Sequence, residues 1–140
     1  MRFVYPFKTE IEDDFVLVQF PDVPEALTNY GPDEDGAYVV HDCLIAALRS
    51  YVEDREPIPR PSPIVGRSFV TLDALESAKL ALAQAMMDEE ISNVALAKRL
   101  GVTEAVVRRL LDLDHRSHIG QVEKALAELG RRLEVRVKAA

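Results

Sequence analysis

Four prolines fall within residues 57–63 and divide the chain. Proline fixes its own φ, lacks an amide hydrogen and keeps the preceding residue out of the helical region, so this segment is expected to be an extended, semi-rigid spacer. The full length of 140 residues is enough for one ordinary domain or two small ones. We therefore expect two units, which are residues 1–70, with the spacer at residues 56–63 before their last strand, and residues 71–140.

The charge of the chain divides close to the same place. A formal net charge of −7 would by itself argue against nucleic acid, because phosphate binding usually needs a basic surface. Residues 1–66 hold 13 acidic and 5 basic side chains, a net charge of −8, whereas residues 67–140 have a net charge of +1. The two halves are therefore expected to have different partners, and the second half can still bind nucleic acid.

The composition also restricts where the chain can act. Cys43 is the single cysteine and cannot form an intramolecular disulfide. The first residues lack the apolar core of a signal peptide, and no stretch approaches the roughly 20 apolar residues of a membrane span. We expect a cytoplasmic protein that does not contact a membrane.

The first half has the pattern of a small sheet with one helix. Aromatic and β-branched residues predict strands over residues 3–7 and 15–20, and a third short strand includes residues 27–30. The apolar spacing then becomes helical over residues 37–52, and residues 66–70 can form one more strand. The predicted order is β-β-β-α-β.

From residue 71 onwards the pattern is helical. Thr71 is the expected N-cap of the first helix, and Ser92 is the expected N-cap of the second, which Gly101 ends. A third helix begins at Thr103, and Gly130 ends a later one. The whole chain is therefore predicted to be α+β, with a small all-α domain after the β-β-β-α-β domain.

Two of these short helices, joined by a glycine turn, have the arrangement that presents a helix to the DNA major groove. Ala97 is small enough for the helices to cross closely, and Gly101 permits the positive φ of the turn. We expect Val102, Val107 and Leu110 to fill the shared core. The second half is thus predicted to be a helix-turn-helix domain of the Cro/repressor type.

The outward residues of the second helix and of the loop after it are the candidate DNA contacts. Thr103 is expected to cap the helix and to lie near a phosphate. Arg108 can donate to guanine, and Glu104 can accept from cytosine, with about 1–3 kcal/mol of discrimination for a bidentate contact. The loop can touch phosphates without reading sequence. The candidate residues are Thr103, Glu104, Ala105, Arg108, Arg109, Arg116, Ser117 and His118.

Residues 133–137 alternate apolar and charged side chains, which is the pattern of a strand. An unpaired strand edge can pair with another copy of itself. Because one small domain makes few DNA contacts, we expect a homodimer or higher homo-oligomer that reads an inverted repeat in operator DNA.

Together these motifs resemble the HicB family of type II antitoxins, in its subgroup with a helix-turn-helix tail. The resemblance covers nearly the whole chain. It rests on residues 20–24, a turn at Thr28 and Gly31, and residues 46–48, 58–62, 96–101, 109–115 and 122–133.

The resemblance implies a partial RNase H-like fold in the first domain, which blocks a small basic toxin. That partner would be a HicA-like ribonuclease that cuts mRNA with a histidine, and the second domain would repress the toxin–antitoxin operon. A first half of charge −8 suits a basic partner. The sequence contains no glycine-rich phosphate loop, no Walker sequence and no Ser/His/Asp order, so we expect no cofactor and no enzymatic activity. Exposed acids are the candidate toxin contacts: Asp13, Asp14, Asp22, Glu25, Asp33, Glu34 and Asp35.

Other readings of the same residues remain alternatives. A two-metal nuclease site needs several carboxylates close together, and some of these acids are candidates for one. They fall in turns, however, with no His or Lys at a suitable spacing, so we expect a solvated acidic face. His115 and His118 have the spacing of half a metal site and lack the remaining ligands, so we expect no metal site and no catalytic residue. A stand-alone transcription regulator, whose first domain senses a ligand or another protein, is the alternative function.

Overall fold

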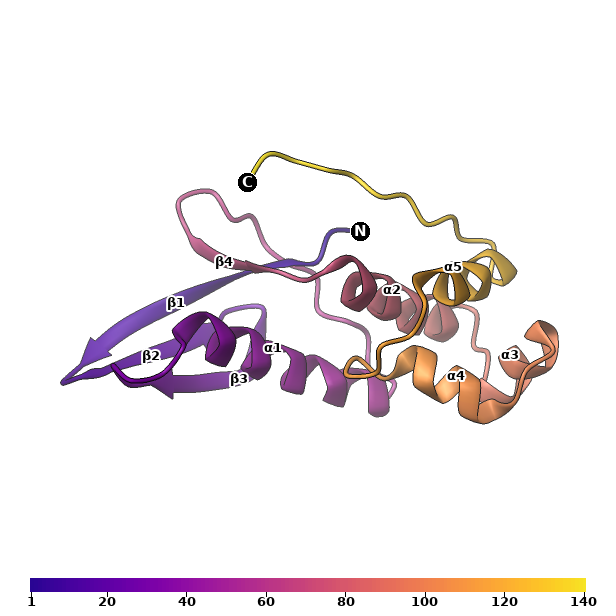
Figure 1. Ribbon diagram of the computed structural model, residues 1–140, viewed down its shortest axis with the longest axis horizontal. Helices are drawn as coiled ribbons and strands as arrows, with labels where there is room; N and C mark the ends of the chain where they lie inside the picture. The colour runs from indigo at the N-terminus through magenta and orange to yellow at the C-terminus, as the bar shows by residue number, and fades with distance from the viewer. The chain divides into compact units, whose positions relative to one another are not determined.

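Strands dominate the first part of the chain and helices the second in the computed structural model, which describes residues 1–140 (Figure 1). The chain divides into two units. The first contains Met1–Asp54 and Ile58–Leu72, and the second contains Arg55–Pro57 and Asp73–Ala140. The predicted α+β class and the order β-β-β-α-β followed by helices are confirmed.

The first unit is built on a four-stranded antiparallel sheet with the strand order β3-β2-β1-β4. Its strands are β1 (Val4–Glu12), β2 (Phe15–Phe20), β3 (Val23–Tyr30) and β4 (Ser68–Thr71). The third strand begins earlier than the predicted residues 27–30, after a register irregularity between Gln19 and Phe20.

Strands β1 and β2 form a ribbon closed by a two-residue turn. The register runs from Lys8 opposite Gln19 to Glu12 opposite Phe15, so Asp13 and Asp14 form the tip. Asp13 has a φ of 54°. This left-handed conformation is one that Asp and Asn adopt more readily than most side chains, and it suits a tight hairpin. The sequence therefore places two carboxylates at the end of the ribbon.

Helix α1 (Gly36–Glu53) packs on one face of the sheet and contacts β3. It begins at Asp35, whose side chain accepts a hydrogen bond from the Tyr38 amide at 3.3 Å. Burial of a large apolar side chain contributes roughly 1.5–3 kcal/mol relative to exposure. The buried apolar residues of the helix and strands are Val40, Leu44, Ile45, Ala47, Leu48, Tyr5, Val18, Phe20, Val23 and Ala26.

The proline segment is fixed to the first unit by two polar contacts. The Tyr5 hydroxyl, which is fully buried, donates to the carbonyl of Pro59 at 2.7 Å. Asp22 accepts from the amide and the hydroxyl of Ser62 at 2.8 and 2.9 Å. Ile58 is buried as well. The segment that follows Pro57 is therefore part of the packed unit and leads directly into β4.

Four helices make the second unit: α2 (Ala74–Asp88), α3 (Asn93–Leu100), α4 (Glu104–Leu111) and α5 (Ile119–Glu128). Helices α2 and α3 each contact both α4 and α5. One apolar cluster lies among the four helices, and it includes Leu82, Met86, Leu96, Val107, Leu110, Val122 and Leu126.

The first helix of this unit begins later than predicted. Thr71, the expected N-cap, is the last residue of β4 and pairs with Val4. The observed N-cap is Asp73, whose carboxylate accepts from the Glu76 amide at 2.7 Å while Glu76 accepts from the Asp73 amide at 3.0 Å. This capping box satisfies two amides at once, which a single Thr hydroxyl cannot do.

The predicted strand over residues 133–137 is not formed within one chain, because no neighbouring strand pairs with it. Residues 131–140 have no regular secondary structure, and Val135 and Val137 are 70% and 91% exposed. Leu133 is partly buried against the apolar cluster. After Leu133 the segment therefore extends with both of its valines exposed.

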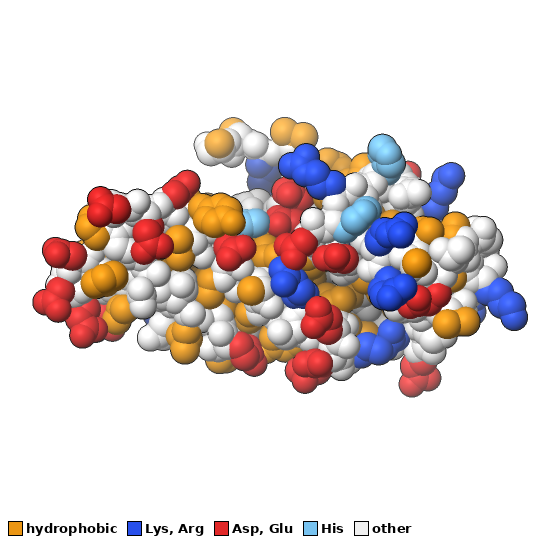
Figure 2. Space-filling view, turned by 60° about the horizontal axis from the view of Figure 1, so that its bottom comes forward, with side chains coloured by type: hydrophobic (Ala, Val, Ile, Leu, Met, Phe, Trp, Pro, Cys, Tyr) orange, Lys and Arg blue, Asp and Glu red, His pale blue; other side chains and the backbone are white.

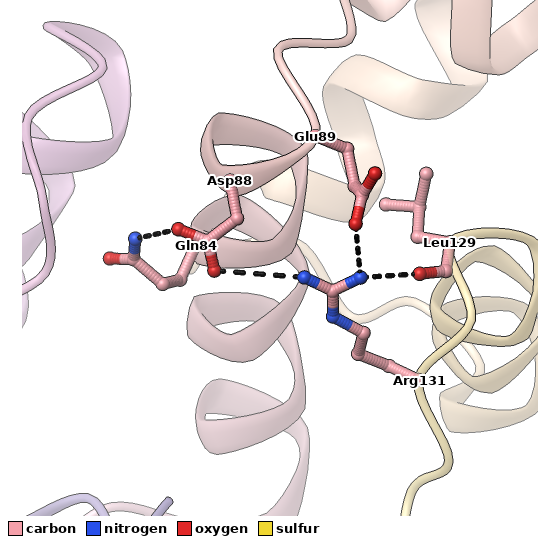
Figure 3. A network of polar contacts seen from close by, with 5 residues as sticks. All are labelled: Gln84, Asp88, Glu89, Leu129 and Arg131. Atoms are coloured by element: carbon pink, nitrogen blue, oxygen red, sulfur yellow. Dashed lines mark hydrogen bonds and ion pairs between the residues drawn. The ribbon is translucent and has the colours of Figure 1, made fainter.

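An ionic network holds the start of this C-terminal segment (Figure 3). Nη1 of Arg131 contacts Glu89 Oε1 at 2.5 Å and donates to the Leu129 carbonyl at 2.6 Å. Nη2 of Arg131 lies 3.7 Å from Asp88, which also accepts from Gln84 at 2.9 Å. Arg131 therefore fixes the start of the exposed segment, which follows α5, beside the C-terminal end of α2.

Candidate DNA-binding helix and protein-binding sheet face

Helices α3 and α4 are joined by a turn that requires glycine. Ser92 caps α3 by accepting from the Ala95 amide at 3.1 Å. Gly101 ends it with a φ of 68°, in the left-handed region that glycine adopts at little cost. The next amide, of Val102, donates back to the Ala97 carbonyl at 3.0 Å. The predicted arrangement of two short helices and a glycine turn is present.

One side of α4 is buried and the other is open to solvent. Val107 and Leu110 are 0% and 2% exposed, as expected for core residues, and Ala97 of α3 is buried near them. Val102 was predicted to join this core, and that prediction is wrong because its side chain is 39% exposed. Leu96 of α3 is fully buried and belongs to the same apolar cluster as Val107 and Leu110.

Thr103 occupies the N-cap position of α4 without acting as a side-chain cap. Its backbone is extended and its carbonyl accepts from the Val106 amide at 3.1 Å, but its hydroxyl makes no capping hydrogen bond. The predicted side-chain cap is therefore wrong. Thr103 is exposed at the positive end of the helix dipole, so its hydroxyl can still serve an external acceptor.

The two candidate base-reading residues contact each other. Arg108 Nη2 lies 3.1 Å from Glu104 Oε2, one helical turn away, and their side chains are 65% and 39% exposed. An exposed pair at this spacing is worth only about 0.3–0.5 kcal/mol. Loss of this contact would therefore cost the protein little. Ala105 is half-buried and Arg109 is exposed on the same helix.

The three remaining candidates lie in the loop between α4 and α5 and differ in their exposure to solvent. Arg116 and His118 are exposed. Ser117 is half-buried, and its hydroxyl lies 2.9 Å from His115 Nδ1 and 3.3 Å from the Arg109 carbonyl. The Ser117 hydroxyl therefore already has partners in the loop and in α4, whereas Arg116 and His118 face solvent and can reach a phosphate.

A lysine from α2, which is not among the residues predicted from the sequence, holds this loop. Lys79 is only 1% exposed, and its ammonium contacts four oxygens of residues 109–117. Burial lowers the pKa of Lys79, and the nearby carboxylates of Asp112 and Asp114 partly oppose that shift. The signal in the sequence is a lone lysine within the otherwise apolar run of residues 78–83.

The seven candidate toxin-contacting acids are not equivalent in the structure. Asp13 and Asp14 are exposed at the ribbon tip, and Asp33 is exposed in the turn before α1. Four others have partners in the first unit, and Asp22 among them is half-buried rather than exposed. These four are Asp22 bound to Ser62, Glu25 to the Tyr51 hydroxyl, Glu34 to the Gly31 amide, and Asp35 to the Tyr38 amide.

The sheet face opposite α1 is the feature that the acids alone did not reveal. Directly opposed residues of an antiparallel pair lie on the same face, so Lys8, Gln19 and Leu27 share this face, as do Glu12 and Phe15. Leu27 and Phe15 are 63% and 49% exposed. The face therefore combines exposed apolar side chains with carboxylates of the ribbon.

Acidic and basic side chains gather in different parts of the surface (Figure 2). Acidic side chains crowd the end of the β1–β2 ribbon, and Lys and Arg side chains gather over α3 and α4. Exposed Phe69 of β4, which pairs with Pro6, adds to the apolar residues of the open sheet face. Each unit thus has its own exposed surface with its own chemistry.

The structure contains no arrangement of side chains for metal chemistry. No group of three or more His, Cys, Asp or Glu side chains is placed to hold a metal ion. Burial raises the pKa of the half-buried Cys43 thiol, and Asp42 raises it further, so this thiol is a poor nucleophile. None of the helices is both long and apolar enough to cross a bilayer.

Comparison with known proteins assigns the family. Residues 4–81 match the HicB-like antitoxins of bacterial toxin–antitoxin systems. Over 131 residues the chain is 37% identical to Antitoxin HicB 2 of Photorhabdus laumondii subsp. laumondii, covering 94% of each chain. It is 33% identical to Antitoxin HicB of Escherichia coli strain K12 over 120 residues, which are 85% of this chain and 87% of the relative.

A third relative extends the match to the C-terminus. Antitoxin HicB of Pseudomonas fluorescens strain Pf0-1 is 34% identical over an alignment of 142 positions, which covers 100% of this chain and 97% of the relative. The similarity therefore includes both units. The chain belongs to the HicB-like antitoxin family and is an antitoxin of a toxin–antitoxin system, not an enzyme.

Proposed function

We propose that the first unit binds and covers a HicA-like, mRNA-cleaving toxin, and that the second unit represses the operon of the pair as a DNA-bound dimer. The observation that carries this proposal is the presence of two different exposed surfaces in one antitoxin chain. One is the acidic and apolar sheet face, and the other is the arginine-bearing side of α4. Because both proposed partners, an mRNA-cleaving enzyme and operator DNA, act in the cytoplasm, we expect the chain to act there as well.

The open sheet face suits a small basic toxin. Leu27, Phe15 and Phe69 supply exposed apolar area, which is typical of the centre of a protein interface. Asp13 and Asp14 supply negative charge at the ribbon tip, which speeds encounter with a basic partner and disfavours acidic ones. A toxin seated on this face is excluded from its RNA substrate by simple occlusion.

Helix α4 suits the role of a recognition helix in a helix-turn-helix. Its buried side contributes to the apolar cluster shared with α3, whereas Arg108 is exposed and Glu104, in its first turn, is partly exposed. Thr103, Arg109, Arg116 and His118 surround them as candidate phosphate contacts, and Ala105 leaves room for close approach to the DNA. Base contacts by Arg108 would give sequence preference, and the phosphate contacts would fix the orientation.

The C-terminal segment suits a role in dimer formation. Val135 and Val137 are exposed on an extended chain that begins at the Arg131 network, and no strand of the same chain pairs with it. Pairing of residues 133–137 with the same residues of a second copy would satisfy the backbone groups along one edge of each segment and bring the valines of the two copies side by side. A two-fold axis would then place two α4 helices on the half-sites of an inverted repeat.

Co-expression of the full-length chain with the toxin encoded beside it tests both roles together. We expect one complex to co-purify, to lack ribonuclease activity and to bind DNA from the promoter of the pair. Substitutions at the ribbon tip should reduce toxin binding only, and substitutions on α4 should reduce DNA binding only. A chain that binds the DNA but never the toxin would instead be a stand-alone regulator.

A further inference from the structure

The buried ammonium of Lys79 lies among oxygens of the last turn of α4 and of the segment that follows it. Its Nζ donates to the carbonyls of Arg109, Asp112 and His115 at 2.9, 2.6 and 2.8 Å, and the Ser117 hydroxyl lies at 2.9 Å. An ammonium has three N–H groups, so all of its donors have acceptors. A charge that is buried in this way is tolerated only when such partners are present.

The first consequence concerns the end of α4. The last four carbonyls of a helix have no partner within the helix and form the negative end of its dipole. The Arg109 carbonyl is one of these, because α4 ends at Leu111. Lys79 donates a hydrogen bond to it and places a positive charge beside it. The ammonium therefore acts as a C-terminal cap supplied by α2.

The second consequence concerns Arg116. Its neighbours on both sides, His115 and Ser117, are bound to Lys79, and their own side chains lie 2.9 Å apart. The Ser117 amide also donates to the His115 carbonyl at 3.0 Å. Arg116 is thus an exposed side chain on a backbone segment that is fixed on both sides by one buried charge.

We propose that Lys79 is a positioning residue for DNA binding, because it sets the end of α4 and the Arg116 loop in one fixed arrangement. This inference rests on the proposed role of α4 as the recognition helix. At 1% exposure Lys79 does not itself reach a phosphate, so its effect on DNA passes through the residues that it holds. It couples base contacts from α4 to phosphate contacts from the loop.

Substitution of Lys79→Met in the full-length chain removes the ammonium and keeps the length of the side chain. Amide hydrogen exchange of the free protein should become faster in residues 112–118 than in the wild type, while α3 and α5 keep their protection. Affinity for operator DNA should fall about tenfold or more, which is the scale expected for the loss of several contacts at once. Lys124→Met, at an exposed lysine of α5, is the matched control and should change neither measurement.

A double-mutant cycle separates positioning from general stability. If Lys79 acts through Arg116, then Lys79→Met should cost less affinity in an Arg116→Ala background than in the wild type. The dependence of log K on log salt should also become shallower by about 0.9 for each phosphate contact that is lost. If the affinity for DNA falls only because part of the protein is unfolded, the fraction of active protein decreases. In that case the effects of the two substitutions add, and the salt slope does not change.

Three results would overturn the inference. They are unchanged exchange of residues 112–118, an additive double-mutant cycle, or an unaltered salt slope in a folded Lys79→Met variant. If that variant does not fold, Ser117→Ala removes one of the four partners and should give smaller changes in the same direction; no change would count against the inference. A wild-type chain that binds no DNA contradicts the proposed function itself, whereas normal wild-type binding with unaffected variants contradicts only the role of Lys79.

Discussion

Glu104 and Arg108 form an ion pair of 3.1 Å across one turn of the exposed side of α4. Each side chain satisfies the other while the protein is free, and each can exchange its partner for a base edge at little cost. The pair therefore keeps Arg108 directed along the helix surface before DNA is present.

Replacement of Arg108 by Ala should weaken binding to the operator of the pair by about 5- to 150-fold, the range that corresponds to loss of a bidentate base contact. Binding to random DNA should weaken much less, because one phosphate contact at most is lost. Titration of labelled operator and random duplexes measures both losses. Arg132→Ala, at an exposed arginine outside α4, is the control, and equal losses on the two duplexes would remove Arg108 from base reading.

At the ribbon tip, we predict that Asp13→Asn combined with Asp14→Asn slows association with the toxin about 3- to 10-fold at low salt, because steering charge is lost. Asn tolerates the φ of 54° at residue 13, so the turn should be kept. Stopped-flow or surface-binding kinetics at two salt concentrations measure the rate. Glu53→Gln, at the end of α1, is the exposed control, and an association rate that is independent of the tip charges would place the toxin elsewhere.

Truncation after Arg132 should reduce dimer formation, because it removes the exposed extended segment and leaves the Arg131 network in place. Val135→Lys combined with Val137→Lys should have the same direction of effect, since it places charge where a strand pair would bury valine. Light scattering over a range of protein concentrations gives the mass. Arg136→Gln, between the two valines, is the matched control, and an unchanged mass in both variants would exclude this segment from the dimer.

The buried phenol of Tyr5 predicts an alkaline loss of stability in the first unit. Burial raises the pKa of Tyr5, and Asp22 raises it further, so the folded state keeps the phenol neutral at pH values where the unfolded chain ionises it. The free energy of unfolding should therefore fall as the pH rises above about 10, by up to about 1.4 kcal/mol per pH unit. Below pH 10 this contribution is fully present.

Comparison with Tyr5→Phe isolates that effect. The variant should lose about 1 kcal/mol at pH 7, because the Pro59 carbonyl loses its donor, and the difference from the wild type should shrink above pH 10. All tyrosines and phenylalanines lie in the first unit and the chain has no tryptophan, so near-ultraviolet circular dichroism follows this unit alone. Tyr38→Phe is the exposed control, and a difference that stays constant with pH would contradict the prediction.

Much of the fold could be predicted because its signals are local. The glycine turn at Gly101, the apolar spacing of α1 and the aromatic and β-branched run of β2 each depend on neighbouring residues, and each element was found. Strand β1 extends to Glu12, beyond the predicted residues 3–7, because the polar residues that follow Phe7 pair with β2. Thr71 failed as a cap because Asp73, two residues later, forms a reciprocal pair with Glu76. A hydroxyl and a carboxylate compete for the same end of a helix, and only the geometry decides between them.

The parts of the candidate site that could not be predicted depend on residues far apart in the sequence. Lys79 meets partners that lie 30 to 38 residues later, and helical periodicity contains no information about them. Val102 is exposed because it lies in the turn between α3 and α4, outside the apolar cluster that their buried residues form. The open sheet face, with Leu27 and Phe15, becomes visible only once the strand register is known.

The most direct test of the whole account is a titration of the ribonuclease activity of the neighbouring toxin with the purified full-length chain. We predict that mRNA cleavage stops once the chain is present in stoichiometric amount, and that the Asp13→Asn and Asp14→Asn variant needs more protein at low salt for the same effect. Cleavage that continues unchanged in an excess of the folded wild-type chain would contradict the account.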